Sequence, residues 1–412
     1  MPFSMSKNIQ VHVIGLIVCL SLFGDLTLFA VLPTHFAMVG VSLANVGILL
    51  SVHRLIRVPG SPIAGVLMDR WGRKRFMIAG LVFAVIATSG YGLVQGFWPF
   101  LIMRVFWGVA WMCINISGMA LVIDLSSSHN RGRYSGQYNT WVMIGLAAGP
   151  LLGGLLVDQV GFQKTMLLGG SITMIALLFA IFLIPKRVSK DGIPEDKFSV
   201  RGLYPSMQLL RTLPVDIWVI FFLFAITLFT GEGVALSTLS LRAQELFGTG
   251  LSLGNWQLGL ASVGGILLGY RSLAAALASP FFGRFSDGQL GRFGVLLISL
   301  LIGALGFALL GLAENLLWMM IGLTLSAFSA GSNMAVLIAW LGDLAAESQR
   351  GSIMGLFATF GDLGSMSGPF IAYQLMGRIS LQLIYIYCAG FFLLGAALLL
   401  LTRWPHYAGG GR

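Results

Sequence analysis

The sequence predicts an all-α membrane protein with twelve transmembrane helices in two pseudo-symmetric six-helix bundles. Of its 412 residues, 57% are hydrophobic and only 10% are charged, whereas soluble domains carry about 25% charged residues. Apolar runs of about 20 residues, the length that a helix needs to cross a bilayer, recur along the whole chain. Several residues that are uncommon in such runs also recur at one spacing in the two halves of the chain.

The first apolar run extends from Val11 to Leu32. It is too long for a signal-peptide core and lacks a clear small-residue cleavage site, so we interpret it as a retained transmembrane helix. Five more runs follow in the first half of the chain and six in the second. The predicted spans are centred near Leu22, Arg57, Phe83, Ala110, Ala147, Met174, Leu223, Leu268, Leu301, Ala327, Phe360 and Leu393.

A long polar stretch separates the sixth span from the seventh. It lies between Pro185 and Pro214 and is rich in lysine, arginine and acidic residues. We therefore predict an N-terminal bundle over 1–184, a cytoplasmic interdomain loop over 185–213 and a C-terminal bundle over 214–412.

The net charge of +10 is explained by membrane orientation. If both termini are cytoplasmic, eighteen of the 25 lysines and arginines fall in inside segments, three in outside segments and four within spans. This distribution follows the positive-inside rule. We expect an integral protein of the inner or plasma membrane with both termini in the cytoplasm, and no binding of nucleic acid.

The two halves of the chain repeat each other. Asp124, Arg131, Gly132, Gly149 and Pro150 recur as the same residue types 219 positions later. Parallel repeats of this kind are typical of secondary transporters, in which the substrate binds near the middle of the bilayer between the repeats.

The loop between the second and third spans reads GVLMDRWGRKR from Gly65 to Arg75. It resembles the cytoplasmic signature G-x-L-x-D-R-x-G-R-K-R of the major facilitator superfamily. The resemblance implies that Asp69, Arg73 and Asp124 form a charge cluster that latches the two halves when the carrier opens outward. Gly65 and Arg131 are expected to belong to this latch. Simple anchoring of a cationic loop on the inside is the alternative.

The fifth span contains a second motif of the same family. Gly145, Gly149, Pro150, Gly153 and Gly154 match the antiporter pattern G-x-x-x-G-P-x-x-G-G. Glycines four residues apart create a flat helix face, and proline removes one backbone hydrogen bond. A generic glycine-packed helix is the alternative interpretation.

Two further segments resemble branches of the family. Gly24-Asp25 precedes Val31-Leu32-Pro33, as in drug-exporting members. The segment from Leu101 to Gly108, which contains Arg104, resembles the fourth-span arginine motif of proton-coupled members.

Seven charged residues lie within predicted spans, where each costs about 2.5–3.5 kcal/mol and is a functional candidate by default. Arg54 and Arg271 lie at matching depths in the two halves, so they are candidates to clamp an anionic substrate. Neutralisation of the intramembrane acids is the alternative. The seven are Asp25, Glu232, Asp362, Arg54, Arg57, Arg104 and Arg271.

Asp25 is the preferred candidate for proton coupling, with Arg104 as its partner and Glu232 as the second choice. A carboxylate in a low-dielectric cavity beside an arginine can take up and release a proton in each cycle. A purely structural role for Asp25 is the alternative. His53 could also titrate, although a lone histidine is more often a hydrogen-bonded packing residue.

Several aromatic and amide side chains could complete a substrate cavity, although such residues also serve ordinary helix packing. With Arg54, Arg57, Arg271 and Asp362, the predicted substrate-binding residues include Trp107, Trp111, Asn115, Asn139 and Asn333.

The sequence therefore predicts a secondary transporter, and we favour a proton-coupled antiporter that exports a small organic molecule by alternating access. An anion transporter or exchanger that uses Arg54 and Arg271 is the first alternative, and a non-transporting membrane sensor is the second. No nucleophile, metal-ligand or cofactor motif is present, so we expect no enzyme activity, no cofactor and no metal. The expected partners are a small-molecule substrate, protons and the lipid bilayer, and the chain is expected to be a monomer.

Overall fold

The computed structural model describes residues 5–127, 129–185, 212–253, 256–288, 290–346 and 349–408. Nearly the whole of the predicted interdomain loop over 185–213 lies outside the described residues.

Each of the twelve predicted spans is helical. The first six are α1 (Lys7–His35), α2 (Leu43–Trp71), α3 (Arg73–Leu93), α4 (Phe97–Leu125), α5 (Arg131–Val160) and α6 (Phe162–Leu183). The seventh is continuous through α8 (Val215–Leu228), the π-helix η3 (Phe229–Ala235) and α9 (Leu236–Phe247). The last five are α10 (Leu260–Ser286), α11 (Gly291–Leu312), α12 (Leu316–Leu344), α13 (Arg350–Leu375) and α14 (Leu381–Ala408).

Within the described residues, ten helical runs are long and apolar enough to cross a membrane. The other two, α2 and α13, have matching lengths of 29 and 26 residues. The fold is therefore a nearly all-helical membrane fold, as predicted. A short 3-10 helix η1 (Phe36–Val39) follows α1, and a small antiparallel hairpin of β1 (Gly250–Leu253) and β2 (Trp256–Gly259) joins α9 to α10. The apolar pattern of the sequence does not predict this hairpin.

Glycines make the tightest turns between helices. Gly72 separates α2 from α3 at a φ of 83°, and Gly161 separates α5 from α6 at a φ of 88°. A single residue reverses the chain at each point because glycine adopts positive φ at no steric cost. At these two points, consecutive helices therefore run antiparallel with almost no connecting loop.

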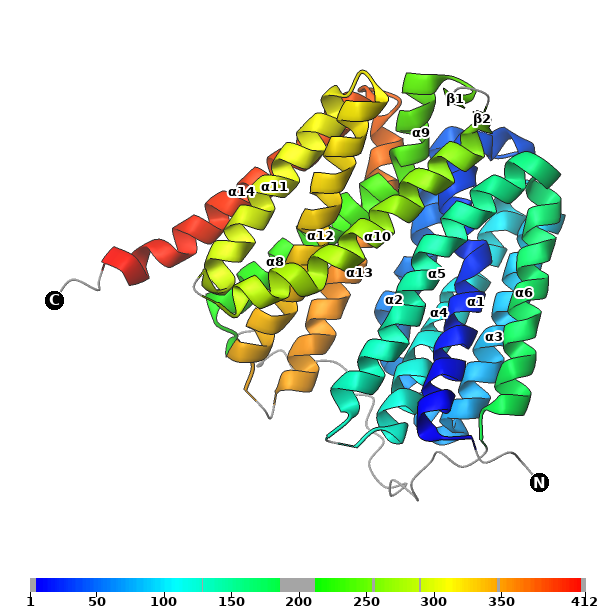
Figure 1. Ribbon diagram of the computed structural model, residues 1–412, viewed down its shortest axis with the longest axis horizontal. Helices are drawn as coiled ribbons and strands as arrows, with labels where there is room; N and C mark the ends of the chain where they lie inside the picture. Colours follow the sequence, from blue (N-terminus) through cyan, green and yellow to red (C-terminus); the bar gives the residue numbers. More distant parts are fainter. Residues whose placement is uncertain are drawn as a thin grey trace. The chain divides into compact units, whose positions relative to one another are not determined.

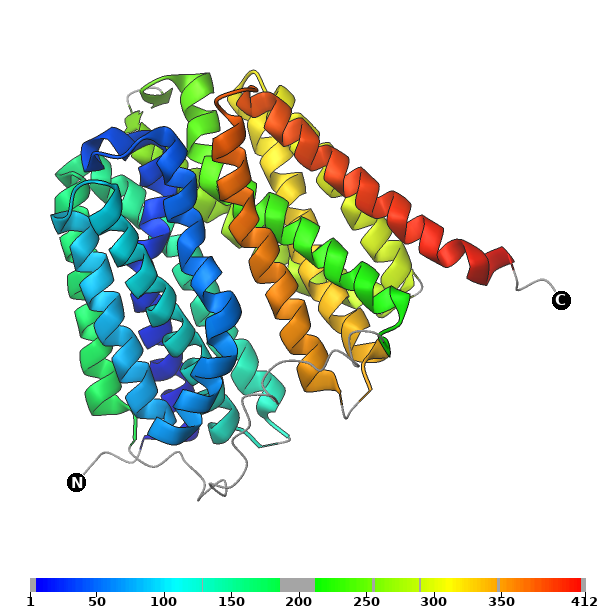
Figure 2. The same cartoon turned by 180° about the vertical axis from the view of Figure 1, so that it is seen from behind.

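The chain divides into two compact units. Unit 1 comprises residues 1–203 and 239–269, and unit 2 comprises residues 204–238 and 270–412. Within unit 1, α1 to α6 run side by side (Figures 1 and 2), and α1 is the most buried of them. Within unit 2, α11 packs against α12 and α14, and α8 packs against α13. The six-helix boundaries predicted from the sequence stay a prediction.

A glycine face of α5 lets α1 approach closely. An added Cβ at Gly145 would lie 3.1 Å from the backbone of Cys19, and one at Gly149 would lie 2.8 Å from Cβ of Leu26. An added Cβ at Gly153 would collide with the side chain of Thr27. The Thr27 hydroxyl also donates a hydrogen bond of 3.1 Å to the carbonyl oxygen of Gly149. The first, second and fourth residues of the predicted antiporter motif thus pack α5 against the buried helix α1.

This close packing predicts a strong effect of a side chain at Gly149. We expect Gly149→Val to force α1 and α5 apart, because overpacking a core costs about 1–3 kcal/mol. Thermal unfolding of the purified protein in detergent measures the loss as a lower melting temperature. Gly136→Val in the same helix is the control, since an added Cβ there meets no atom within 4 Å. Equal melting temperatures for the two variants would contradict the interpretation.

Candidate functional site

The central feature of unit 1 is an ion pair buried among its helices. Asp25 lies about two thirds of the way along α1, and Arg104 lies about one quarter of the way along α4. The Nη1 atom of Arg104 donates to Oδ1 of Asp25. The Arg104 side chain is 0% exposed and the Asp25 side chain is 5% exposed. A charge pair shielded to this degree must be satisfied entirely by protein groups.

Arg104 joins α4 to three other helices. Its Nε donates to the carbonyl oxygen of Leu49 at 2.8 Å, and its Nη1 also donates to the Tyr91 hydroxyl at 3.3 Å. Its Nη2 lies 2.6 Å from Nδ1 of His53. The guanidinium carbon also lies 5.7 Å from the centre of the Phe29 ring. Four helices, α1 to α4, therefore converge on one guanidinium group.

The contact with Arg104 fixes the state of His53. A guanidinium group can only donate hydrogen bonds, so Nδ1 of His53 must be the acceptor. The imidazole is therefore neutral in this arrangement and carries its proton on Nε2. A protonated His53 would place a donor and a positive charge against Arg104. The residue type makes His53 a candidate from the sequence alone, but the sequence does not predict this contact or the role of Tyr91.

Two glycines of the sequence motifs allow the helices to converge. An added Cβ at Gly24 would collide with the side chain of Thr88 on α3. An added Cβ at Gly108, one turn after Arg104, would lie 2.7 Å from the carbonyl oxygen of His53. The absence of side chains at these positions brings α1 onto α3 and α2 onto α4, so that Arg104 can reach the backbone of α2.

The face of α4 that carries Arg104 continues toward the end of the helix. Trp107 is buried, and Trp111 and Asn115 are half-buried one and two turns further on. The spacing of four residues places these three side chains on the same face. Arg54 of α2 is half-buried and lies close enough to Asp25 and His53 to act on both electrostatically. Arg57, one turn later, acts on His53 in the same way.

Unit 2 contains a different ion pair. Nη1 of Arg271 on α10 lies 3.2 Å from Oε1 of Glu232 on η3. Arg271 is 3% exposed, whereas Glu232 is 36% exposed. An added Cβ at Gly231 would lie 2.7 Å from Nη2 of Arg271, so glycine leaves room for the guanidinium. Single turns of π-helix within α-helices occur frequently at functional sites.

The remaining predicted substrate-binding residues differ in their surroundings. Asn333 on α12 is fully buried and donates to the hydroxyls of Thr227 and Ser329. Asp362 on α13 is half-buried, and Asn139 on α5 is exposed. Arg54 and Asn139 belong to unit 1, whereas Arg271, Asn333 and Asp362 belong to unit 2.

At one end of the helices, Arg73 pairs with Asp124. Arg292 pairs with Asp343 in the second half at 3.2 Å, and the two pairs are separated along the chain by the spacing of the sequence repeat. Within the described residues, the side chains of Asp69 and Arg131 make no hydrogen bond or ion pair. Gly65 has open space where a Cβ would be placed. Of the predicted latch, the structure therefore joins Arg73 to Asp124, and Asp69 makes no ion pair with either of them.

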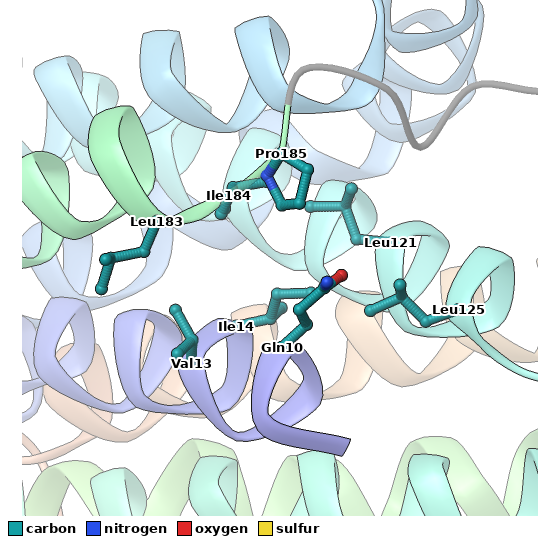
Figure 3. A pocket seen from close by; sticks show the side chains of 8 residues that line it. All are labelled: Gln10, Val13, Ile14, Leu121, Leu125, Leu183, Ile184 and Pro185. Atoms are coloured by element: carbon teal, nitrogen blue, oxygen red, sulfur yellow. The ribbon is translucent and has the colours of Figure 1, made fainter. Parts of the chain in front are cut away.

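A small pocket of unit 1 lies at the ends of α1, α4 and α6 (Figure 3). Its polar member is Gln10, on the first turn of α1. Asp25 lies eleven residues beyond Ile14, which is roughly 16 Å along a helix, so this pocket is separate from the buried ion pair. The lining residues are Gln10, Val13, Ile14, Leu121, Leu125, Leu183, Ile184 and Pro185.

Comparisons with known proteins agree over the whole chain. The family model described as Major Facilitator Superfamily matches residues 14–271 and 261–411. A protein of Klebsiella pneumoniae (strain 342) named Multidrug resistance protein MdtG is 24% identical over 403 residues, covering 96% of this chain and 93% of its own. The protein of the same name from Salmonella choleraesuis (strain SC-B67) is 26% identical over 409 residues, covering 96% and 95%.

Solved structures of transporters share the fold. A bacterial homolog of the human lysosomal transporter Spinster superimposes with a TM-score of 0.78 at 15% identity, covering 97% of both chains. The human organic anion transporter MFSD10 superimposes with a TM-score of 0.67 at 19% identity, covering 96% of this chain and all of its own.

The geometry around Arg104 predicts a large effect of removing its charge. We expect Arg104→Gln to leave Asp25 buried without the cation that pairs with it and to lower the free energy of unfolding by about 3–5 kcal/mol. The double variant Asp25→Asn with Arg104→Gln should lose less, because it leaves no uncompensated charge. Thermal unfolding in detergent measures both, with exposed Arg378→Gln as the control. A single variant that is as stable as the double one would refute the pairing argument.

Proposed function

The chain belongs to the major facilitator superfamily, and we propose that it is a proton-coupled antiporter that exports a small organic molecule by alternating access. The family establishes a multi-span membrane transporter of small molecules, not an enzyme. Proton coupling, direction of transport and a monomeric state with both termini in the cytoplasm are parts of the proposal.

The single observation that carries the proposal is the buried contact between Asp25 and Arg104. When Asp25 is ionised, the pair holds α1 to α4. When Asp25 binds a proton, this attraction is lost, while Arg104 keeps its bonds to Leu49, Tyr91 and His53. The attraction between these helices therefore differs between the two protonation states of Asp25. A proton can shift the equilibrium between two conformations only if it binds one of them more tightly, and this difference in attraction is a way to achieve that.

Two surrounding features support export of an organic molecule. The face of α4 that follows Arg104 offers two indole rings and an amide, from Trp107, Trp111 and Asn115, which suit an amphipathic substrate. The relatives from Klebsiella and Salmonella carry the name of a multidrug resistance protein. Asp25 on α1 contacts Arg104 on the same helix, α4, that carries these side chains. Protonation of Asp25 would therefore change the packing of α1 against α4 and promote release of the substrate.

The charged helix ends fit a role in the conformational cycle. Arg73–Asp124 and Arg292–Asp343 hold the ends of neighbouring helices within the first and the second half of the chain. Asp69 makes no ion pair within the described residues of this conformation, so it is available to form one in another. We propose that Gly65, Asp69, Arg73, Asp124 and Arg131 act as the latch.

The proposal predicts transport that depends on a pH gradient. Vesicles reconstituted with the purified carrier should move ethidium, an organic cation, faster when a pH gradient is imposed, and Asp25→Asn should abolish this acceleration. Exchange of ethidium at equal pH should persist in Asp25→Asn, because it needs no net proton movement. Glu314→Gln, an exposed site, is the control. Flux that ignores the gradient in the unmodified protein would exclude proton antiport.

A second candidate function is transport of an organic anion. It is favoured by Arg271, whose buried Nε has no hydrogen-bond partner within the described residues, and by the name of the structural neighbour that transports organic anions. Arg54 and Arg57 would supply the positive charge of the first half in this case. Glu232 would then compete with the substrate for Arg271.

Transport of an organic anion predicts opposite effects of substitutions at Glu232 and at Arg271. If Arg271 binds an anion, Glu232→Gln should strengthen binding of carboxyfluorescein, because the competing carboxylate is removed, and Arg271→Gln should weaken it about tenfold or more. Fluorescence titration of the purified variants measures both affinities. Unchanged carboxyfluorescein binding in both variants would exclude the anion function at this site.

A further inference from the structure

The carboxylate of Asp158, near the end of α5, contacts the beginning of α10. Its Oδ2 accepts a hydrogen bond of 2.7 Å from the backbone N–H of Ser262, although the two residues are 104 positions apart. Ser262 is the third residue of α10. The first N–H groups of a helix have no partner within the helix, and a side chain just before the helix usually accepts from the second or third of them.

The residue just before α10 cannot supply such a cap, because it is Gly259. An added Cβ at Gly259 would lie 2.5 Å and 2.6 Å from the two carboxylate oxygens of Asp158. The carboxylate therefore occupies the space where the side chain of a normal cap residue would begin. The cap of α10 is supplied by another transmembrane helix.

Small residues bring α5 and α10 together next to this cap. An added Cβ at Gly154 would collide with the carbonyl group of Ala261, and one at Gly265 would collide with that of Pro150. Further along α10, an added Cβ at Gly269 would lie 3.0 Å from the carbonyl oxygen of Ala147. Positions 150, 154 and 158 thus form a second face of α5, distinct from the glycine face that packs against α1.

We propose that Asp158 is a gating residue that stabilises the conformation in which these ends of α5 and α10 are in contact. The proposal rests on the proposed function, because alternating access requires such a contact to separate in part of the cycle. When the helices part, α10 loses its cap and Asp158 loses its hydrogen bond. A negative charge at the positive end of a helix dipole adds to the preference for contact.

A distance measurement tests the proposal. Spin labels are attached at Gln159 and Gln257, two exposed positions beside the contact, after the native Cys19, Cys113 and Cys388 are replaced by alanine. Pulsed electron spin resonance in lipid nanodiscs then gives the ratio of open to closed populations. We expect Asp158→Ala to raise this ratio roughly tenfold, as expected for loss of a charged cap.

Two variants bracket this result. Asp158→Asn keeps an oxygen acceptor but loses the charge, so it should give a smaller increase. Glu314→Gln removes an exposed acid from the same predicted side of the membrane and should leave the ratio unchanged. An unchanged ratio in Asp158→Ala, or an equal increase in Glu314→Gln, would overturn the proposal.

A double variant separates gating from simple helix capping. In Asp158→Ala the space beside Gly259 is vacant, so Gly259→Ser can give α10 a cap of its own. If Asp158 acts as a gate, the double variant should regain thermal stability yet keep the raised open-to-closed ratio. A double variant with the original ratio would show that Asp158 only caps the helix and would overturn the proposal.

The outcome is independent of proton coupling. If Asp158→Ala shifts the distances while the unmodified carrier ignores a pH gradient, the gate stands and proton antiport fails. If gradient-driven ethidium transport is normal in the unmodified carrier and Asp158→Ala leaves the distances unchanged, the gate fails and proton antiport stands.

Discussion

The structure of unit 1 depends on one constraint, the cost of holding a charge where water cannot reach it. The guanidinium of Arg104 is fully buried, so every partner must come from protein groups. Asp25 supplies the opposite charge, while Leu49, Tyr91 and His53 receive other donors. The glycines at 24 and 108 follow from the same constraint, because side chains there would keep the helices too far apart for these bonds to form. A residue that is expensive to bury therefore determines the positions of four helices.

The segment of α5 that is rich in glycine and contains Pro150 packs against two helices, α1 and α10. Its positions 145, 149 and 153 are in contact with α1, whereas positions 150, 154 and 158 are in contact with the beginning of α10. The contact with α1 involves a helix that is mostly buried and that carries Asp25. A movement of α5 would therefore change the packing of the helix that carries Asp25 and also the hydrogen bond that caps α10. This double contact gives a physical reason for so many small residues in one span, beyond close packing alone.

The two repeated halves of the chain share their ion pairs at the helix ends but differ in their ion pairs inside the spans. The pair Arg73–Asp124 has a counterpart in Arg292–Asp343 at the repeat spacing, so the charged ends of the helices are duplicated. The interiors are not duplicated, because Asp25 pairs with an arginine of the fourth span, whereas Glu232 pairs with an arginine of the eighth span and lies on a π-helix. The duplicated pairs hold helix ends together in both halves. Under the proposed function the interior charges determine what is coupled and carried, which is a physical reason for the difference between the halves.

The sequence by itself determined the number and order of the helices, because crossing a bilayer demands apolar runs of a set length and leaves little freedom in interpreting them. It also identified the charged residues within the spans, since each is too costly to be incidental. It also predicted Arg104 as the partner of Asp25. It could not determine the other contacts: that Arg104 also binds His53 and Tyr91, that Asp69 makes no ion pair with Arg73, or that Asp158 caps α10. Contacts between residues 13 to 104 positions apart depend on helix rotation and depth. These are set by close packing at glycines, which hydrophobic periodicity does not encode. Only the tertiary structure decided them.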